Sequence, residues 1–179
     1  MRRAATAFVF FALLCGAGAG AAQDPRAIPL VDQSGAPFTL DDLHGRPVVV
    51  TFVASRCSDA CPIANAMFFN LEQRFARQGT SAVLVTVTLD PEYDSPFVMS
   101  RLARQLQADP ARWRFAGGGL VEVHALMRAF GITAERDRHG IPEVHSSFVY
   151  VLDSHGRLSR TLLLSTNLVD EATRALSAR

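Results

Sequence analysis

The sequence predicts an α/β protein with a mixed central sheet and helices on both faces. Two continuous apolar runs rich in β-branched residues, 48–54 and 82–89, are typical of strands buried on both faces. A segment with helical periodicity separates them, and two more such segments follow the second run. Two further strands are expected at 148–152 and 158–164, and the short turn at 153–156 between them indicates an antiparallel hairpin.

Each expected helix has a start or stop signal. The first opens at Pro62, since proline is accepted in a first helical turn, and ends at Gly79. The second opens at Pro96, the third closes at Gly131, and Asn167 is the expected N-cap of the last. The side chains expected to face the core are Ile63, Met67, Phe68, Leu71 and Phe75, then Val98, Leu102 and Leu106, then Val123, Leu126, Met127 and Phe130, and finally Leu168, Ala172 and Leu176.

The resulting order of elements is β, α, β, α, α, β, β, α. Strands separated by helices pair in parallel, and the closing hairpin adds antiparallel edge strands. A cysteine pair, Cys57 and Cys61, lies where the first core strand meets its helix. This combination predicts a thioredoxin-like fold.

The first 22 residues have the pattern of a secretory signal peptide. Two arginines precede an apolar cluster at 8–14 and a run of small residues at 16–22. The expected organisation is therefore a signal peptide over 1–22 and one thioredoxin-like domain over 23–179.

The alternative for this N-terminal segment is an uncleaved anchor. Residues 4–22 approach the length that crosses a bilayer. The protein is expected to be periplasmic in either case, released if the segment is cleaved and held at the inner membrane if it is not. Membrane contact is expected only in the uncleaved case. Cys15 lies inside this segment, which leaves Cys57 and Cys61 in a compartment that permits disulfides.

Composition excludes several function classes. Of the 179 residues, 49% are hydrophobic and 20% charged, which is typical of a globular chain. The net charge of +1 and the lack of a basic run argue against a nucleic-acid partner. All 18 basic residues are arginine, so the chain has neither a Schiff-base lysine nor a phosphate-loop lysine.

Cys57 and Cys61 are separated by three residues, and Pro62 follows them at the start of a helix. The helix N-terminus favours a thiolate, and Arg56 adds a positive charge, so both thiols are expected to be more acidic than free cysteine. A disulfide that closes so short a loop contributes only roughly 2 kcal/mol, which makes a purely structural bond a weak explanation. Redox chemistry and metal binding both remain open.

A metal site needs a third donor, and the chain has five histidines. Three of them precede glycine in expected turns, namely His44, His139 and His155. His124 lies beside the apolar face of the third helix. His145 directly precedes the strand 148–152, whose start can approach the first helix in a parallel layout, and it is the candidate ligand. The position alone does not decide whether His145 binds a metal.

Three segments, taken together, resemble the Sco/SenC family of copper-binding cytochrome c oxidase assembly proteins. Residues 52–62 contain a Cys-x-x-x-Cys-Pro motif, 89–96 contain Asp-Pro-x-x-Asp-x-Pro, and 144–153 contain a histidine before an apolar strand. They occur in the family's order, and the resemblance extends from Phe38 to about Leu164.

The resemblance implies a thioredoxin-like domain that binds one copper ion, Cu(I) or Cu(II), through Cys57, Cys61 and His145. It further implies an exported metallochaperone that helps to assemble the binuclear copper centre of cytochrome c oxidase. The expected partner is the copper-accepting oxidase subunit or a similar exported copper protein. The alternative is a periplasmic thiol-disulfide oxidoreductase, in which Cys57 attacks and Cys61 resolves, so the chain's status as an enzyme stays open.

Other positions either match or depart from the family pattern. Asp59 and Asp90 match acidic positions and could tune the site from outside it, whereas Asp90 and Asp94 could simply cap and turn the strand into the next helix. Ala54 stands where the family often has an aromatic residue, and Val144 where an acidic residue commonly precedes the histidine. These departures concern affinity and partner preference more than ligand identity.

Overall fold

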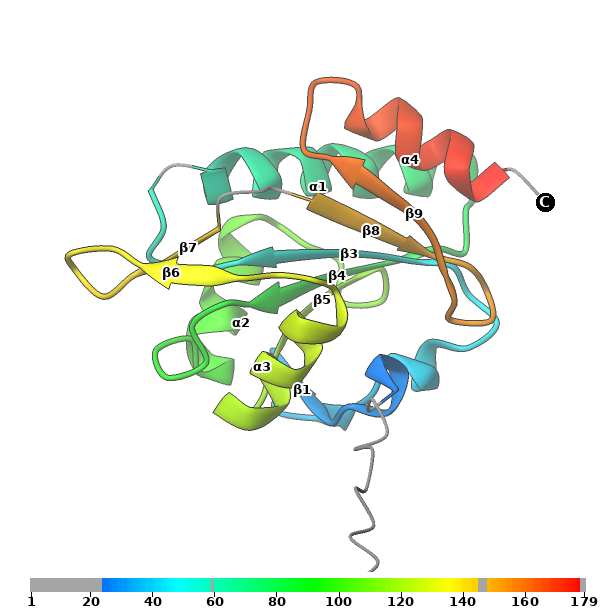
Figure 1. Cartoon of the computed structure of the whole chain (residues 1–179). Coiled ribbons are helices and arrows are strands. Elements are labelled where there is room, and N and C mark those ends of the chain that lie inside the picture. Colours follow the sequence, from blue (N-terminus) through cyan, green and yellow to red (C-terminus); the bar gives the residue numbers. More distant parts are fainter. Residues whose placement is uncertain (1–23, 59, 145–147, 178–179) are drawn as a thin grey trace, which may run out of the picture.

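The structure, a computed structural model, describes residues 24–58, 60–144 and 148–177 (Figure 1). In this part of the chain a seven-stranded sheet has the order β2-β1-β5-β4-β3-β8-β9, and β6 and β7 form a separate hairpin. The strands are β1 (Leu30–Asp32), β2 (Pro37–Phe38), β3 (Val48–Val53), β4 (Val83–Thr88), β5 (Trp113–Gly117), β6 (Ala134–Arg136), β7 (Pro142–Val144), β8 (Phe148–Leu152) and β9 (Leu158–Leu163). The helices are η1 (Pro25–Ala27), η2 (Asp41–Leu43), α1 (Ala60–Gln78), α2 (Pro96–Gln105), α3 (Leu120–Ala129) and α4 (Leu168–Ser177).

The sheet is mixed, as the sequence predicts. β3 pairs in parallel with β4 and antiparallel with β8, so Val50 lies opposite Val85 on one side and Tyr150 on the other. β8 and β9 form the expected antiparallel hairpin. Every residue of β3 and β4 is buried, which explains why both strands are continuous apolar runs.

Alternate residues of β3 point to opposite faces of the sheet. Val48 and Val50 pack on the face that α3 covers, with Val123 and Leu126 of that helix. Val49 packs on the other face, among residues of α1, α2 and α4. Figure 1 shows α1 and α4 on one side of the sheet and α3 on the other. Helices on both faces are therefore confirmed.

The expected order of elements lacks several short strands. The most important is β5, which pairs in parallel with β4 and antiparallel with β1 in the middle of the sheet. Trp113 of β5 is fully buried, and its indole Nε1 donates a hydrogen bond to Thr86 Oγ1 at 2.9 Å. β1, β2, β6 and β7 are also absent from the predicted order because each spans only two or three residues.

The helical core positions are mostly as predicted. Phe68, Leu71 and Phe75 of α1 are buried, and Met67 packs against the same cluster. The prediction is wrong for Ile63, whose side chain is 51% exposed.

In α2 the predicted face is shifted by one position. Met99 and Ala103 are the buried residues, while Val98 is only half-buried. Leu102 and Leu106 are partly buried and pack against the core, as expected. The apolar face of α2 therefore includes Met99 and Ala103 beside the predicted Leu102 and Leu106.

The expected signal peptide at 1–22 lies outside the described residues. Over residues 24–58, 60–144 and 148–177, no helix has both the length and the apolar character needed to cross a membrane.

Candidate metal site

The candidate site lies at the edge of the sheet where β3 ends. β3, β4 and β5 run parallel, so the loops that follow them meet at this edge. Cys57 lies in the loop after β3, and Cys61 lies in the first turn of α1.

The start of β8 reaches the same edge for a reason opposite to the one expected. β8 is antiparallel to β3, so Phe148 begins beside the end of β3. A parallel strand would begin at the far edge, so the parallel layout used to connect His145 with the first helix is wrong. His145 itself, three positions before Phe148, lies outside the described residues.

Both cysteines are free thiols in different environments. Cys57 is half-buried, and its backbone N–H donates to Ala54 O at 3.1 Å, which turns the loop toward α1. Cys61 is only 6% exposed and packs with Val53 and Ala64. The backbone N–H of Ala54 donates to Cys61 Sγ at 3.4 Å. The pair therefore presents one accessible and one enclosed sulfur.

Burial raises the pKa of Cys61 to about 12, and a hydrogen bond with Cys57 adds to the increase. The expectation of an acidic thiol is therefore wrong for Cys61. Desolvation raises the pKa of Cys61 by more than the helix N-terminus lowers it. The positive charge of Arg56 is paired with the Asp90 carboxylate, since Arg56 Nη2 lies 2.6 Å from Asp90 Oδ2. At neutral pH Cys61 is a buried protonated thiol that shares a hydrogen bond with Cys57.

This asymmetry predicts unequal thiol reactivity. In the reduced, metal-free protein at pH 8, iodoacetamide is expected to modify Cys57 at least about tenfold faster than Cys61, because only the thiolate reacts and Cys61 is enclosed. Peptide mass spectrometry after timed quenching measures both rates. Equal rates for the two thiols would contradict the described environment of Cys61.

The buried carboxylate of Asp94 holds the cysteine loop. It is 3% exposed and accepts hydrogen bonds from Ser55 N at 3.1 Å, from Ser55 Oγ, and from Thr88 Oγ1 at 2.6 Å. The cap of α2 is Ser95, whose side chain accepts from Val98 N. The reading of Asp94 as a helix cap is therefore wrong, since its side chain connects β4 to the residues just before Cys57.

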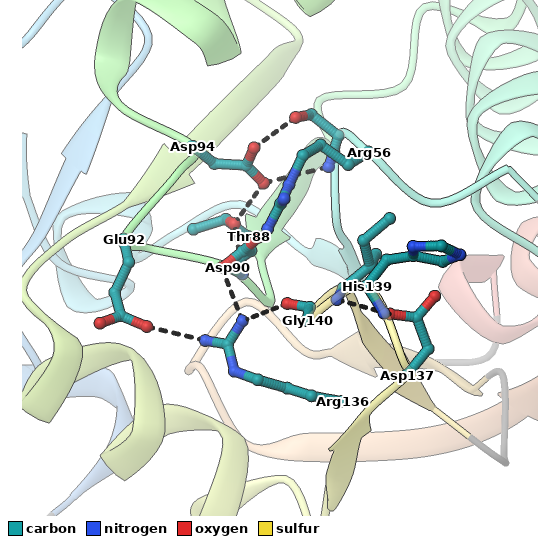
Figure 2. A network of polar contacts seen from close by, with 11 residues as sticks. Arg56, Thr88, Asp90, Glu92, Asp94, Arg136, Asp137, His139 and Gly140 are labelled. Carbon is teal, nitrogen blue, oxygen red and sulfur yellow. Dashed lines mark hydrogen bonds and ion pairs between the residues drawn. The ribbon is translucent and has the colours of Figure 1, made fainter.

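Asp90 is 1% exposed and receives an arginine on each oxygen (Figure 2). Arg56 Nη2 donates to Oδ2 at 2.6 Å, and Arg136 Nη1 donates to Oδ1 at 3.2 Å. The Asp90 carboxylate raises the pKa of Arg56 above its usual value. Arg56 also stacks on Tyr93, with its guanidinium carbon 4.3 Å from the ring centroid. The backbone carbonyl of Asp90 accepts from Tyr93 N and Asp94 N, so Asp90 does form the expected turn.

Arg136 is the residue of this network that sequence reasoning missed. It is one of 18 arginines and lies 46 positions from Asp90, so no local pattern distinguishes it. Asp59, the other acidic candidate, lies outside the described residues.

The other histidines do not complete a three-membered donor group with the thiols among the described residues. His44 precedes β3 and His155 lies in the β8–β9 turn, so their rings, with centroids 5.8 Å apart, meet at the opposite edge. His139 lies in the β6–β7 turn, and His124 is half-buried in α3. Among the described residues, no three His, Cys, Asp or Glu side chains are grouped to hold a metal ion.

Comparison with known proteins identifies the relatives of this chain. The sequence pattern of the family described as SCO1/SenC matches residues 21–178. The SCO1 protein homolog of Bacillus subtilis is 22% identical over 161 residues, which cover 86% of this chain and 83% of the relative.

Two solved structures show the fold. ScoI of Bradyrhizobium japonicum with copper bound has a TM-score of 0.72 at 20% identity and covers 83% of this chain and 94% of its own. BsSco is described as a member of the Sco family of cytochrome c oxidase assembly proteins with a disulfide switch. It has a TM-score of 0.70 at 17% identity, and the match covers 84% of this chain and 92% of BsSco. The predicted thioredoxin-like fold is confirmed.

Proposed function

Because the chain belongs to the SCO1/SenC family, we propose that it is an exported copper chaperone that binds one copper ion through Cys57, Cys61 and His145. Its role is to help assemble the binuclear copper centre of cytochrome c oxidase by passing copper to the accepting subunit. The observation that carries the proposal is the pair of free thiols at the edge where β8 begins.

The donor chemistry fits copper. Thiolates favour soft Cu(I), and an added imidazole also accommodates Cu(II). The N–H of Ala54 already donates to Cys61 Sγ, so the thiolate formed on metal binding keeps a donor. Cys57, being half-buried, is the sulfur that a client's ligands can reach first during exchange.

Copper affinity is expected to depend on pH. The pKa of Cys61 is raised to about 12, so its thiol stays protonated between pH 6 and 8, and copper must displace that proton to bind the sulfur. Each released proton raises the apparent affinity about tenfold per pH unit, which gives at least about a hundredfold over this range. Competition titrations with a Cu(I) chelator of known proton dependence measure the slope. If the copper affinity did not change between pH 6 and 8, proton release from Cys61 would be contradicted.

The second candidate function is thiol-disulfide exchange, which the difference between the two cysteines favours. Cys57 as thiolate would attack a client disulfide and release one client thiolate. Cys61 would then lose its proton, attack Cys57 Sγ and release the second client sulfur. The client gains two electrons, and Cys57 and Cys61 end as a disulfide that a periplasmic dithiol reductant must reopen. His145 has no role in this sequence.

Incubation of the copper-loaded protein with the isolated copper-accepting domain of the oxidase tests the proposal. One arm starts with the acceptor reduced and metal-free, and measures the copper content of the acceptor after the two proteins are separated. The other starts with the acceptor's cysteines as a disulfide, and follows their reduction by the metal-free reduced protein. The chaperone proposal expects transfer in the first arm, and it expects His145→Ala to deliver less copper because that variant holds the ion less tightly. Reduction alone, with no copper transferred, would favour the oxidoreductase.

Export through the segment at 1–22 is part of the proposal. Cleavage after Ala21 or Ala22 would release the domain, and an uncleaved segment would anchor it. Mass spectrometry of the exported product distinguishes the two forms.

A further inference from the structure

Arg136 connects two parts of the chain that meet at the candidate site. It is the last residue of β6, opposite Pro142 of β7, in a hairpin that pairs with no strand of the main sheet among the described residues. Its Nη2 donates to Glu92 Oε2 at 2.8 Å, and its Nη1 donates to Asp90 Oδ1 at 3.2 Å and to Gly140 O at 2.7 Å. One guanidinium therefore holds its own hairpin and the loop after β4 together (Figure 2).

The contact continues to the cysteine loop through Asp90. The second oxygen of this buried carboxylate accepts from Arg56, the residue directly before Cys57. Figure 2 shows Asp90 between the two arginines. Arg136, Asp90 and Arg56 thus form a continuous chain of charge-assisted bonds from the hairpin to the cysteine loop.

The hairpin is the segment that leads to the expected histidine ligand. β7 ends at Val144, immediately before His145 in the sequence. At its base the hairpin is held by apolar packing, since Ala134 packs against the core. At Arg136 the contacts described above are polar. Loss of the guanidinium therefore leaves the base of the hairpin packed but removes the bonds that set its position against the cysteine loop.

We propose that Arg136 is a positioning residue for the metal site, which it orients by tying the β6–β7 hairpin through Asp90 to the loop that carries Cys57. This inference rests on the proposed function, because it assumes that His145 binds the metal. A planar guanidinium suits the task, since two separate nitrogens reach two carboxylates while one also reaches a carbonyl. A lysine ammonium has no such fixed fork.

The test compares Cu(I) affinity among variants of the reduced protein by anaerobic chelator competition. Arg136→Met removes the guanidinium, and Arg138→Met is the matched control on the same hairpin, because Arg138 is exposed and donates only to His139 in the described contacts. Both changes are made in the wild-type and in the His145→Ala background. We expect Arg136→Met to weaken affinity about tenfold, as loss of an outer partner of a metal ligand does, and Arg138→Met to change it less than about twofold.

The His145→Ala background separates positioning from a general structural effect. If Arg136 acts through the histidine, Arg136→Met adds no further loss once His145 is gone. Arg136→Lys is expected to recover part of the affinity in the wild-type background. A loss of equal size in both backgrounds, or no difference between Arg136→Met and Arg138→Met, would overturn the inference.

A folding check and a second variant make the result interpretable. Thermal unfolding of each metal-free variant shows whether it folds. If Arg136→Met does not, Glu92→Gln serves instead, since it removes one exposed partner and is expected to give a smaller loss of affinity that also disappears without His145. Failure of the wild type to bind Cu(I), or an unchanged affinity in His145→Ala, would refute the proposed function together with this inference. If His145→Ala lowers the affinity as expected but the Arg136 variants do not show the expected pattern of losses, only the inference about Arg136 is refuted.

Discussion

Replacing Cys61 with serine is expected to lower Cu(I) affinity on the order of a thousandfold, because a hard hydroxyl replaces one of two soft thiolates. The side chain is enclosed by Val53 and Ala64 and is nearly the size of serine, so the fold is expected to persist. The measurement is chelator competition on the reduced protein, with circular dichroism as the folding check.

Ser58→Ala is the matched control for this prediction. Ser58 lies between the two cysteines in the same loop, is exposed, and supplies no thiol. Its replacement is expected to leave copper affinity within about twofold of wild type. A Cys61→Ser variant that keeps near-normal affinity would show that the enclosed sulfur is not a ligand.

Replacing Asp94 with alanine is expected to destabilise the metal-free protein by about 3 kcal/mol. The carboxylate is buried and accepts hydrogen bonds from Ser55 and Thr88, so its removal leaves buried donors without an acceptor. Urea unfolding, followed by fluorescence of the single tryptophan Trp113, measures the change. Because Ser55 precedes Cys57 by two residues, a reduced copper affinity is also expected.

Asp94→Asn provides the comparison for the alanine variant. The amide keeps one acceptor oxygen and the side-chain volume, so it is expected to lose less stability than alanine does. A loss below about 1 kcal/mol for Asp94→Ala would mean that water replaces the carboxylate at little cost. The proposed role of Asp94 in holding the cysteine loop would then be wrong.

The elements that the sequence predicts correctly carry strong, local hydrophobic patterns. β3 and β4 are unbroken apolar runs, and α1 repeats apolar residues over 19 positions. β5 has no such pattern, because Trp113–Gly117 includes an arginine and a glycine. It is a strand because β4 and β1 lie on either side of it and because the Gln33 side chain accepts from Phe115 N at 2.9 Å. These partners are distant in sequence and leave no local pattern.

The same limit applies to the candidate site. The spacing of Cys57 and Cys61 is a local feature, and it predicts a candidate site without a structure. The raised pKa of Cys61 depends on burial, which the fold creates, and the sequence position of Arg56 suggested the opposite shift. The bond between Asp90 and Arg136 joins residues 46 positions apart and follows from the fold alone.

Anaerobic titration of the reduced protein with Cu(I), wild type beside His145→Ala, tests most directly whether two sulfurs and this imidazole bind one ion. Saturation at one copper per chain is expected for the wild type, with an affinity that falls at least about tenfold when the imidazole is removed. An identical stoichiometry and affinity in the two proteins would contradict the three-ligand site.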